Sequence, residues 1–287
     1  MARQGRFVRV FRSIALAGGA LFLGHCDRES AEIPAPVAPE TVPPIDIAVR
    51  PLAPPPPLNR AELITGLAQA ASIYGAGSTV TGSDPLVGRT FSLKLPFGCR
   101  GPAATGEVSE GVAQWQWGDN QASIRLSMIP GDWIASPLVA GAVVVEDGES
   151  PENAWEAVEG FWIERPWLAT ESCPAASLSA SISAPPTAQT VGLVAVFPEG
   201  GSRLGRRNGR AYQHTLRAEG DTPLTPPEGG FALRLEGRVV GFPNNQAGRC
   251  MAFNPDQRPT CVAAVQLDRV AFETAATGET LAEWRVN

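Results

Sequence analysis

The sequence predicts a mainly β protein, an antiparallel sandwich or barrel-like domain with one short N-terminal helix after a disordered tether. Three observations lead to this fold class. Apolar and polar residues alternate along several segments after residue 82. The 30 glycines and 27 prolines make turns frequent. Four of the five cysteines lie beyond residue 98, a supply of disulfides typical of small exported β domains.

The first 26 residues have the pattern of a secretory signal peptide. Four arginines precede an uncharged, mostly apolar run over residues 13–24. Twelve residues are too few for a helix to span a bilayer, which takes about 20. A basic stretch followed by a short apolar run is typical of a signal peptide, so we expect the rest of the chain to be exported.

The end of this region resembles the lipobox of bacterial lipoproteins. The resemblance covers Leu23-Gly24-His25-Cys26 and implies that Cys26 is lipidated and becomes the first residue of the mature protein. His25 stands where that family has a small residue, so the alternatives are cleavage at another position or an uncleaved membrane anchor. Asp27 resembles the signal that retains some lipoproteins at the inner membrane. The resemblance thus implies a periplasmic protein anchored to the inner membrane, with the outer membrane as the alternative.

Residues 27–58 contain ten prolines and end in a run of four. Such a segment cannot bury a core and favours extended polyproline II structure. At about 3.1 Å per residue its reach is at most ~100 Å. We therefore expect a tether that holds the folded part away from the membrane.

Residues 59–76 are expected to form a short helix. Asn59 and Glu62 are spaced as a capping box, and Gly75 ends the helical pattern. The apolar face comprises Leu63, Leu67, Ala70, Ala71 and Tyr74. This face either docks on the core or binds a partner.

Period-two alternation predicts the strands that follow. The clearest are 91–97, a hairpin formed by 113–117 and 124–128, and the segments 212–216, 233–239 and 282–286. The segment 191–197 is wholly apolar and is predicted to be a strand on that ground. Residues 154–163 are ambiguous between a helical turn and a strand. In 265–272 the apolar parity changes at Asp268-Arg269, which predicts a β-bulge.

The stretch 175–190, rich in Ser, Ala and Pro, separates two groups of predicted strands. It divides the chain into a first β half, 82–176, and a second, 188–287. A single domain over 82–287, with this stretch as a long loop, is the alternative.

With Cys26 assigned to lipid, four cysteines remain for disulfides. Ten residues separate Cys250 from Cys261, which suits a hairpin loop, and the pair Cys99–Cys173 follows by elimination. Each closure is expected to stabilise the fold by ~3–4 kcal/mol. No zinc site is predicted, because there is no Cys-x-x-Cys.

The charge balance of the exported part excludes one class of partner. Without the four N-terminal arginines, 19 of the 23 basic residues remain against 29 acidic ones, a net charge of −10. Such a surface repels phosphates, so we expect no binding of nucleic acid.

Two groups of residues are candidate binding sites. A glycine-rich loop, here called the arginine loop (residues 200–210), gathers four arginines in an acidic protein, and guanidinium groups bind carboxylates or phosphates through paired hydrogen bonds. Its arginines are Arg203, Arg206, Arg207 and Arg210. Trp115 and Trp117 point to the same side of one predicted strand, as an aromatic platform for sugar rings requires.

No catalytic residue, metal site or cofactor is predicted. His214 is the one histidine beyond the signal region, so sites that need two histidines are excluded. The acidic run over residues 146–159 lacks the spacing of a calcium loop and is read as a solvated face. We expect a non-catalytic, membrane-tethered binding or structural module of the cell envelope that recognises a protein or glycan. The alternative is a periplasmic hydrolase that uses a pair of carboxylates.

Overall fold

A computed structural model describes residues 53–104, 106, 109–143, 154–174, 189–218, 220 and 223–286. The predicted signal peptide, the lipobox and the tether up to residue 52 lie outside the described residues. The described chain belongs to one compact unit, Ala53–Asn287. Its elements are α1 (Arg60–Gly75), β1 (Thr90–Phe97), β2 (Ala113–Trp117), a 3-10 turn (Asp119–Gln121), β3 (Ser123–Met128), β4 (Gly131–Asp132), β5 (Trp155–Trp162), β6 (Val191–Pro198), β7 (Tyr212–Arg217), β8 (Phe231–Val239), β9 (Gly248–Met251), β10 (Thr260–Thr274) and β11 (Thr280–Arg285).

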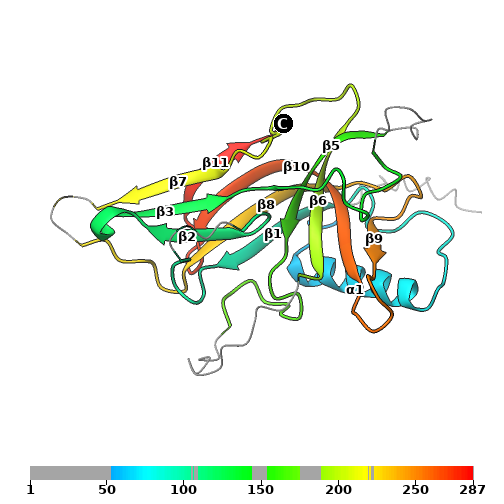
Figure 1. Ribbon diagram of the computed structural model, residues 1–287, viewed down its shortest axis with the longest axis horizontal. Coiled ribbons are helices and arrows are strands. Elements are labelled where there is room, and N and C mark those ends of the chain that lie inside the picture. Colours follow the sequence, from blue (N-terminus) through cyan, green and yellow to red (C-terminus); the bar gives the residue numbers. More distant parts are fainter. Residues whose placement is uncertain are drawn as a thin grey trace, which may run out of the picture. The chain divides into compact units, whose positions relative to one another are not determined.

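The predicted mainly β fold is confirmed, and the strands form two open sheets (Figure 1). The larger sheet runs β1-β8-β10-β6-β5-β4, and the smaller runs β2-β3-β7. The long strand β10 joins the larger sheet together. Its first part lies between β9 and β6, and its later part lies between β8 and β11. Among the described strands neither sheet closes into a barrel, so of the predicted architectures the sandwich-like one fits.

Two details of the sheets differ from a pair of antiparallel β halves. The pairing of β6 with β10 is parallel, whereas the other pairings between named strands are antiparallel. Strands from before and after residues 175–190 also pair with each other, β1 with β8, β3 with β7 and β5 with β6. The two stretches therefore share both sheets.

The predicted β-bulge lies in β10. Leu267 pairs with Gly237 and Arg269 pairs with Glu236, so Asp268 is the extra residue. Gly237 is required opposite the bulge, because a Cβ there would lie 2.1 Å from the carbonyl oxygen of Gln266. The extra residue brings the apolar side chains on both sides of it to the same face, as the change of parity predicted.

The apolar side chains form two clusters on opposite faces of the larger sheet. The main cluster fills the space beneath the smaller sheet and beneath α1, with Leu93, Phe161 and Phe272 at its centre. The second covers the other face of β5, β6 and β10, where Trp155 and Phe242 pack with ring centroids 5.1 Å apart. The segment 154–163, ambiguous in the sequence, is thus a strand buried on both faces.

Helix α1 is capped as predicted. The side chain of Asn59 accepts a hydrogen bond from the backbone of Glu62, whose carboxylate accepts one from Asn59 N–H. Leu63 and Leu67 are buried in the main cluster. Leu58, assigned to the tether by its neighbours' composition, is 2% exposed, because it bridges to Phe91 at the edge of β1.

The outer face of β8, β10 and β11 carries a network of ion pairs. Arg234 donates twice to Glu273, which is only 4% exposed. Arg269 lies 2.7 Å from Glu283 and 3.4 Å from Glu236. These charges alternate across neighbouring strands, an arrangement that keeps one face of the sheet polar while the other is buried.

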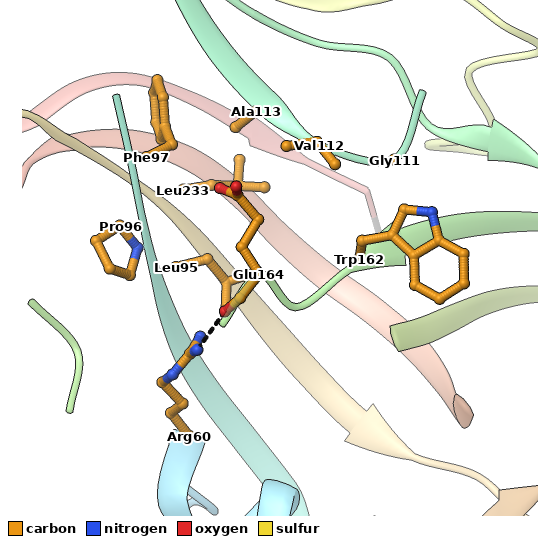
Figure 2. Close-up of a pocket in the computed structure, with 10 residues that line it drawn as sticks. All are labelled: Arg60, Leu95, Pro96, Phe97, Gly111, Val112, Ala113, Trp162, Glu164 and Leu233. Carbon is orange, nitrogen blue, oxygen red and sulfur yellow. Dashed lines mark hydrogen bonds between the residues drawn. The ribbon is translucent and has the colours of Figure 1, made fainter. Parts of the chain in front are cut away.

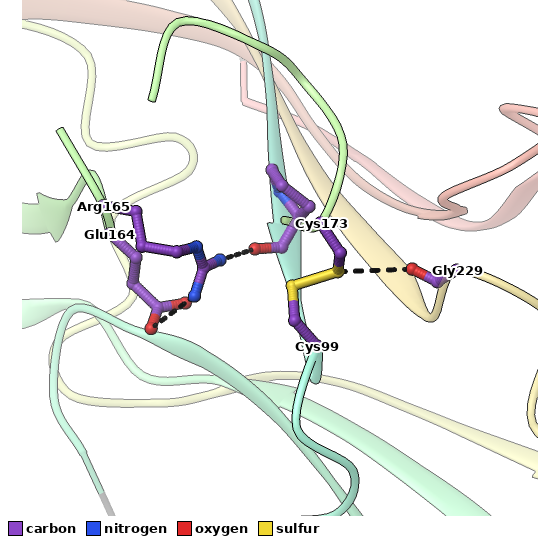
Figure 3. Close-up of a disulfide and its surroundings, with 6 residues drawn as sticks. Cys99, Glu164, Arg165, Cys173 and Gly229 are labelled. Atoms are coloured by element: carbon purple, nitrogen blue, oxygen red, sulfur yellow. Dashed lines mark hydrogen bonds and ion pairs between the residues drawn. A yellow bond between two sulfur atoms is a disulfide. The ribbon is translucent and has the colours of Figure 1, made fainter. Parts of the chain in front are cut away.

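Both predicted disulfides are present, Cys99–Cys173 and Cys250–Cys261. The second joins directly opposed residues of β9 and β10. The first fixes the segment 163–173, here called the strap, beside the edge of β1, where Arg165 Nη2 donates to the Pro96 carbonyl at 2.6 Å (Figure 3). The strap thus covers a strand edge that would otherwise offer unpaired backbone groups.

Candidate functional site: a pocket beside the arginine loop

The arginine loop lies against β5, where the acidic run ends. Arg203 donates to both carboxylate oxygens of Glu156, at 2.7 and 2.8 Å, and Arg206 Nη1 lies 3.7 Å from the same carboxylate. Glu159 Oε1 accepts two backbone hydrogen bonds, from Arg207 N at 2.6 Å and Asn208 N at 2.9 Å. The arginine loop and the acidic run, which are far apart in the sequence, therefore meet in one place.

Two consecutive turns explain the shape of the loop. Arg206 N donates to the Arg203 carbonyl, with Gly205 at φ 84° inside that turn. Arg210 N donates to the Arg207 carbonyl, and the two central residues, Asn208 and Gly209, have φ of 51° and 75°. Asn-Gly is the favoured pair where both central residues need positive φ.

The other two arginines of the loop also have partners within the chain. Arg207 Nη2 donates to the Ala211 carbonyl at 2.6 Å, and its guanidinium lies 4.6 Å from the ring centre of Tyr212. Arg210 Nε donates to the Arg207 carbonyl at 3.1 Å. An anionic partner at this loop, as the sequence predicted, would have to compete with these contacts and with Glu156.

The loop forms one wall of an open pocket of about 200 Å³. The opposite wall comes from β4 and β5, where Asp132 and Glu159 are direct cross-strand partners. Such partners have Cβ atoms about 5 Å apart on the same face of a sheet. The lining residues are Pro130, Gly131, Asp132, Ile134, Glu156, Ala157, Val158, Glu159, Arg206, Asn208 and Gly209.

The carboxylates of Asp132 and Glu159, which are cross-strand partners, have different environments. Glu159 is 6% exposed, and this burial raises the pKa of its carboxyl group against the opposing effect of the two backbone N–H groups. Its second oxygen, Oε2, accepts no hydrogen bond from the part of the chain that the structure describes. Asp132 is exposed and accepts a hydrogen bond from Ile134 N at 3.2 Å. The pocket thus has one fixed carboxylate in its wall and one nearer solvent.

Sequence reasoning missed Asp132 and Asn208 as pocket residues. β4 has only two residues, so no alternation marks Asp132, and its pairing with β5 spans 27 positions of sequence. Glu156 and Glu159 were assigned to a solvated acidic face, which the burial of Glu159 corrects. The Asn-Gly pair was a signal for the turn, but not for what the turn faces.

Trp115 and Trp117 lie elsewhere, on β2. Trp115 is 4% exposed in the main apolar cluster, edge-on to Trp117 at 5.4 Å and to Phe231 at 5.9 Å. Its ring also covers Gly98, where an added Cβ would lie 2.3 Å from the indole. Trp115 therefore offers no open face to a sugar ring, and Trp117 alone, half-buried, remains of the predicted platform.

A second cavity, beneath the strap, is far smaller (Figure 2). Its volume of about 10 Å³ suits a single water molecule. Glu164 lines it together with Phe97 and Leu233, and burial raises the pKa of the Glu164 carboxyl group despite the nearby Arg165. The cavity is too small for a ligand. Because the Glu164 carboxyl group is buried beside it, ionisation of this group affects the stability of the protein.

We expect Glu164→Gln to be more stable than the parent protein at pH 8 and equal to it at pH 4. The raised pKa means that the native state holds more protons than the unfolded state above the ordinary value of 4.5. The free energy of unfolding therefore falls as the pH rises through that window, and Gln removes this fall. Urea unfolding at both pH values measures it, with exposed Glu279→Gln as the control. A less stable Glu164→Gln at pH 8 would show that the ion pair with Arg165 outweighs the burial of the charge.

Within the described residues, no three side chains of His, Cys, Asp or Glu converge in a way that could hold a metal ion. Comparison with known protein families, with curated proteins and with solved structures finds no match. The fold and the pocket define a class, a mainly β protein with a sandwich-like pair of sheets and one open, mixed-charge pocket beside a loop. Its function is argued below from these features.

Proposed function

We propose that the protein is a non-catalytic, lipid-anchored module of the periplasm that binds a protein or glycan of the cell envelope. The observation that carries this proposal is the pocket between β5 and the arginine loop. It is open and is lined by β4 and β5, and its polar groups are held in place by backbone hydrogen bonds and ion pairs. A fixed surface of this kind favours binding, because little conformational entropy is lost when a partner docks.

The proposed location, in the periplasm and anchored to the membrane, is supported by the sequence. The basic N-terminus, the short apolar run and the lipobox-like segment ending at Cys26 support export and anchoring, and the proline-rich segment supports a tether. Two disulfides in the folded part suit an oxidising compartment. Among the described residues, no helix has the length and apolar character needed to cross a membrane.

A hydrolase is the second candidate, and one observation favours it. Asp132 and Glu159 face each other across β4 and β5, and the pKa of Glu159 is raised by burial. Paired carboxylates with unlike environments are the groups that cleave glycosidic bonds. Two observations argue against a hydrolase. The pocket volume of about 200 Å³ is smaller than the ~300–1,000 Å³ of sites that enclose a ligand. In addition, Glu159 Oε1 already accepts two hydrogen bonds.

Lipid anchoring at Cys26 predicts that a substitution there moves the protein from the membrane fraction to the soluble fraction. In the parent strain the mature protein should sediment with membranes, and Cys26→Ser should release it into the soluble periplasmic fraction. The reason is that a cysteine thiol carries the lipid, which serine cannot replace. Immunoblotting of the two fractions measures the effect. Retention of Cys26→Ser in the membrane would instead identify an uncleaved N-terminal anchor.

The binding part is tested with the soluble Cys26→Ser protein. It is incubated separately with purified peptidoglycan and with detergent-solubilised envelope proteins, and what it retains is identified after washing. We expect one of the two to be retained, and a double variant, Asp132→Asn with Glu159→Gln, to retain much less. Failure of both to bind would refute the binding module, and release of sugar reducing ends would establish the hydrolase.

A further inference from the structure

We infer that the pocket between β5 and the arginine loop holds a single neutral sugar ring of a glycan, through its hydroxyl groups. This inference rests on the proposed binding function and specifies its ligand. It follows from three properties of the pocket, namely its size, the kinds of hydrogen-bonding groups on its two walls, and how these groups are fixed.

The size limits the ligand to one small group. The pocket volume of about 200 Å³ is below the ~300–1,000 Å³ of sites that enclose a drug-sized ligand. This is room for one ring, but not for an extended oligosaccharide or a folded segment of protein. Because the pocket is open, the rest of a polymer could continue into solvent from either side.

The two walls carry opposite hydrogen-bonding groups. The β4–β5 wall presents acceptors, the carboxylates of Asp132, Glu156 and Glu159, of which Glu156 is already paired with Arg203 and Arg206. The loop wall presents donors, the Arg206 guanidinium, which is 30% exposed, and the exposed amide of Asn208. Ionised carboxylates only accept hydrogen bonds, and guanidinium groups only donate them.

A hydroxyl group satisfies both walls, because it donates one hydrogen bond and accepts others. An ammonium group could bind Asp132 and Glu159, but it would lie next to the positive charge of Arg206. A carboxylate or phosphate could bind Arg206, but it would face the three carboxylates of Asp132, Glu156 and Glu159. Neighbouring hydroxyl groups on one ring can use both walls at once, so the pocket disfavours either charged group and favours a neutral sugar.

The polar groups are also held ready for a ligand. The Oε1 atom of Glu159 is fixed by the two backbone N–H groups of the Asn-Gly turn, and no residue that the structure describes donates to its Oε2. Arg206 is positioned near Glu156, whose other partner is Arg203. Pro130 and Ile134 also line the pocket, so the C–H groups of a ring have apolar side chains to pack against. Such preorganisation raises affinity without further contacts.

The test measures binding of small glycosides to the soluble Cys26→Ser protein. The probes are the methyl glycosides of glucose, galactose, mannose and N-acetylglucosamine, followed by saturation-transfer NMR and titration. Glucosamine and glucuronate serve as the cationic and anionic counterparts. We expect at least one neutral glycoside to bind more tightly than both charged sugars, with a Kd that Asp132→Asn and Glu159→Gln each raise at least tenfold, because each variant weakens a hydrogen bond to a charged acceptor.

Two features keep the result clear. Glu159→Gln retains an oxygen that can accept from Arg207 N and Asn208 N, so the loop should keep its shape, and a thermal melt verifies this. The matched control is Gln213→Ala on the exposed face of β7, which should leave the Kd unchanged. The inference is overturned if no neutral glycoside binds, if binding ignores both pocket variants, or if a charged sugar binds as tightly as the best neutral one.

Failure here is distinguishable from failure of the proposed function. If the protein retains an envelope component that none of the glycosides displaces, the sugar assignment is wrong and the binding module stands. If a glycoside binds in the pocket but is cleaved, the assignment of the ligand stands and the non-catalytic function is wrong. Quantification of released methanol in the same titrations separates these two results.

Discussion

Replacing Cys99 and Cys173 together by serine is expected to lower the free energy of unfolding by about 4–5 kcal/mol. The two residues are 74 positions apart, and in the chain-entropy account a loop of this length costs the unfolded state about 4.5 kcal/mol of conformational freedom. The disulfide also fixes the strap at the edge of β1, so its loss should free this segment. A protein of this size should then lose roughly 10–15 °C of thermal stability.

The second disulfide provides the matched comparison. Cys250 and Cys261 are 11 positions apart, so replacing both by serine is expected to cost only about 3 kcal/mol. Urea unfolding gives both values, and limited proteolysis should cut the strap in the first variant alone. Equal losses in the two variants would show that strain or solvation, rather than loop length, decides the contribution of each disulfide.

The sequence predicted the elements better than their arrangement. Alternation marked the strands that became β1, β2, β3, β7, β8 and β11, a wholly apolar run marked β6, and the change of parity at Asp268 located the bulge in β10. These signals are local, because a residue's face depends on its immediate neighbours. The parallel pairing of β6 with β10 depends instead on how distant segments meet, which no local pattern encodes.

The pocket illustrates the same limit. Its walls come from three segments, 130–134, 156–159 and 206–209, that are separated by long stretches of chain. Composition made the arginine loop conspicuous, yet its arginines are engaged by Glu156, by backbone carbonyls and by Tyr212. An excess of one charge in the sequence therefore did not predict a free charge at the surface.

Trp115 shows why an aromatic pattern does not by itself predict a platform. Alternation placed Trp115 and Trp117 on one face of β2, and the structure places both on the side that meets the core. Period two tells which residues share a face, but which face is buried depends on the sheet packed against it. Here the larger sheet packs against β2, and the contact of Trp115 with Phe231 of β8 joins residues more than 100 positions apart.

The largest expected effect of a single substitution is at Arg60, the first residue of α1, whose side chain lies inside the protein. Arg60 is 1% exposed, and burial lowers the pKa of its guanidinium to about 10, so it stays charged at neutral pH. It donates to three backbone carbonyls of the strap, at 3.0 Å to Arg165, 2.9 Å to Leu168 and 2.6 Å to Glu164, and Figure 2 shows the last of these. One side chain thus joins the helix to the strap.

Arg60→Met should therefore lower the free energy of unfolding by about 3 kcal/mol, because it leaves buried carbonyl groups without donors while keeping most of the side-chain volume. Arg60→Lys should recover only part of this loss, since an ammonium group lacks the planar fork that reaches three acceptors. The exposed Arg125→Met on β3 is the control and should change stability by less than about 0.5 kcal/mol. Urea unfolding compares the three variants, and hydrogen exchange should show faster opening of residues 163–168 in Arg60→Met. If Arg60→Lys matches the parent protein, a single charge suffices and the geometry of the guanidinium is not what holds the strap.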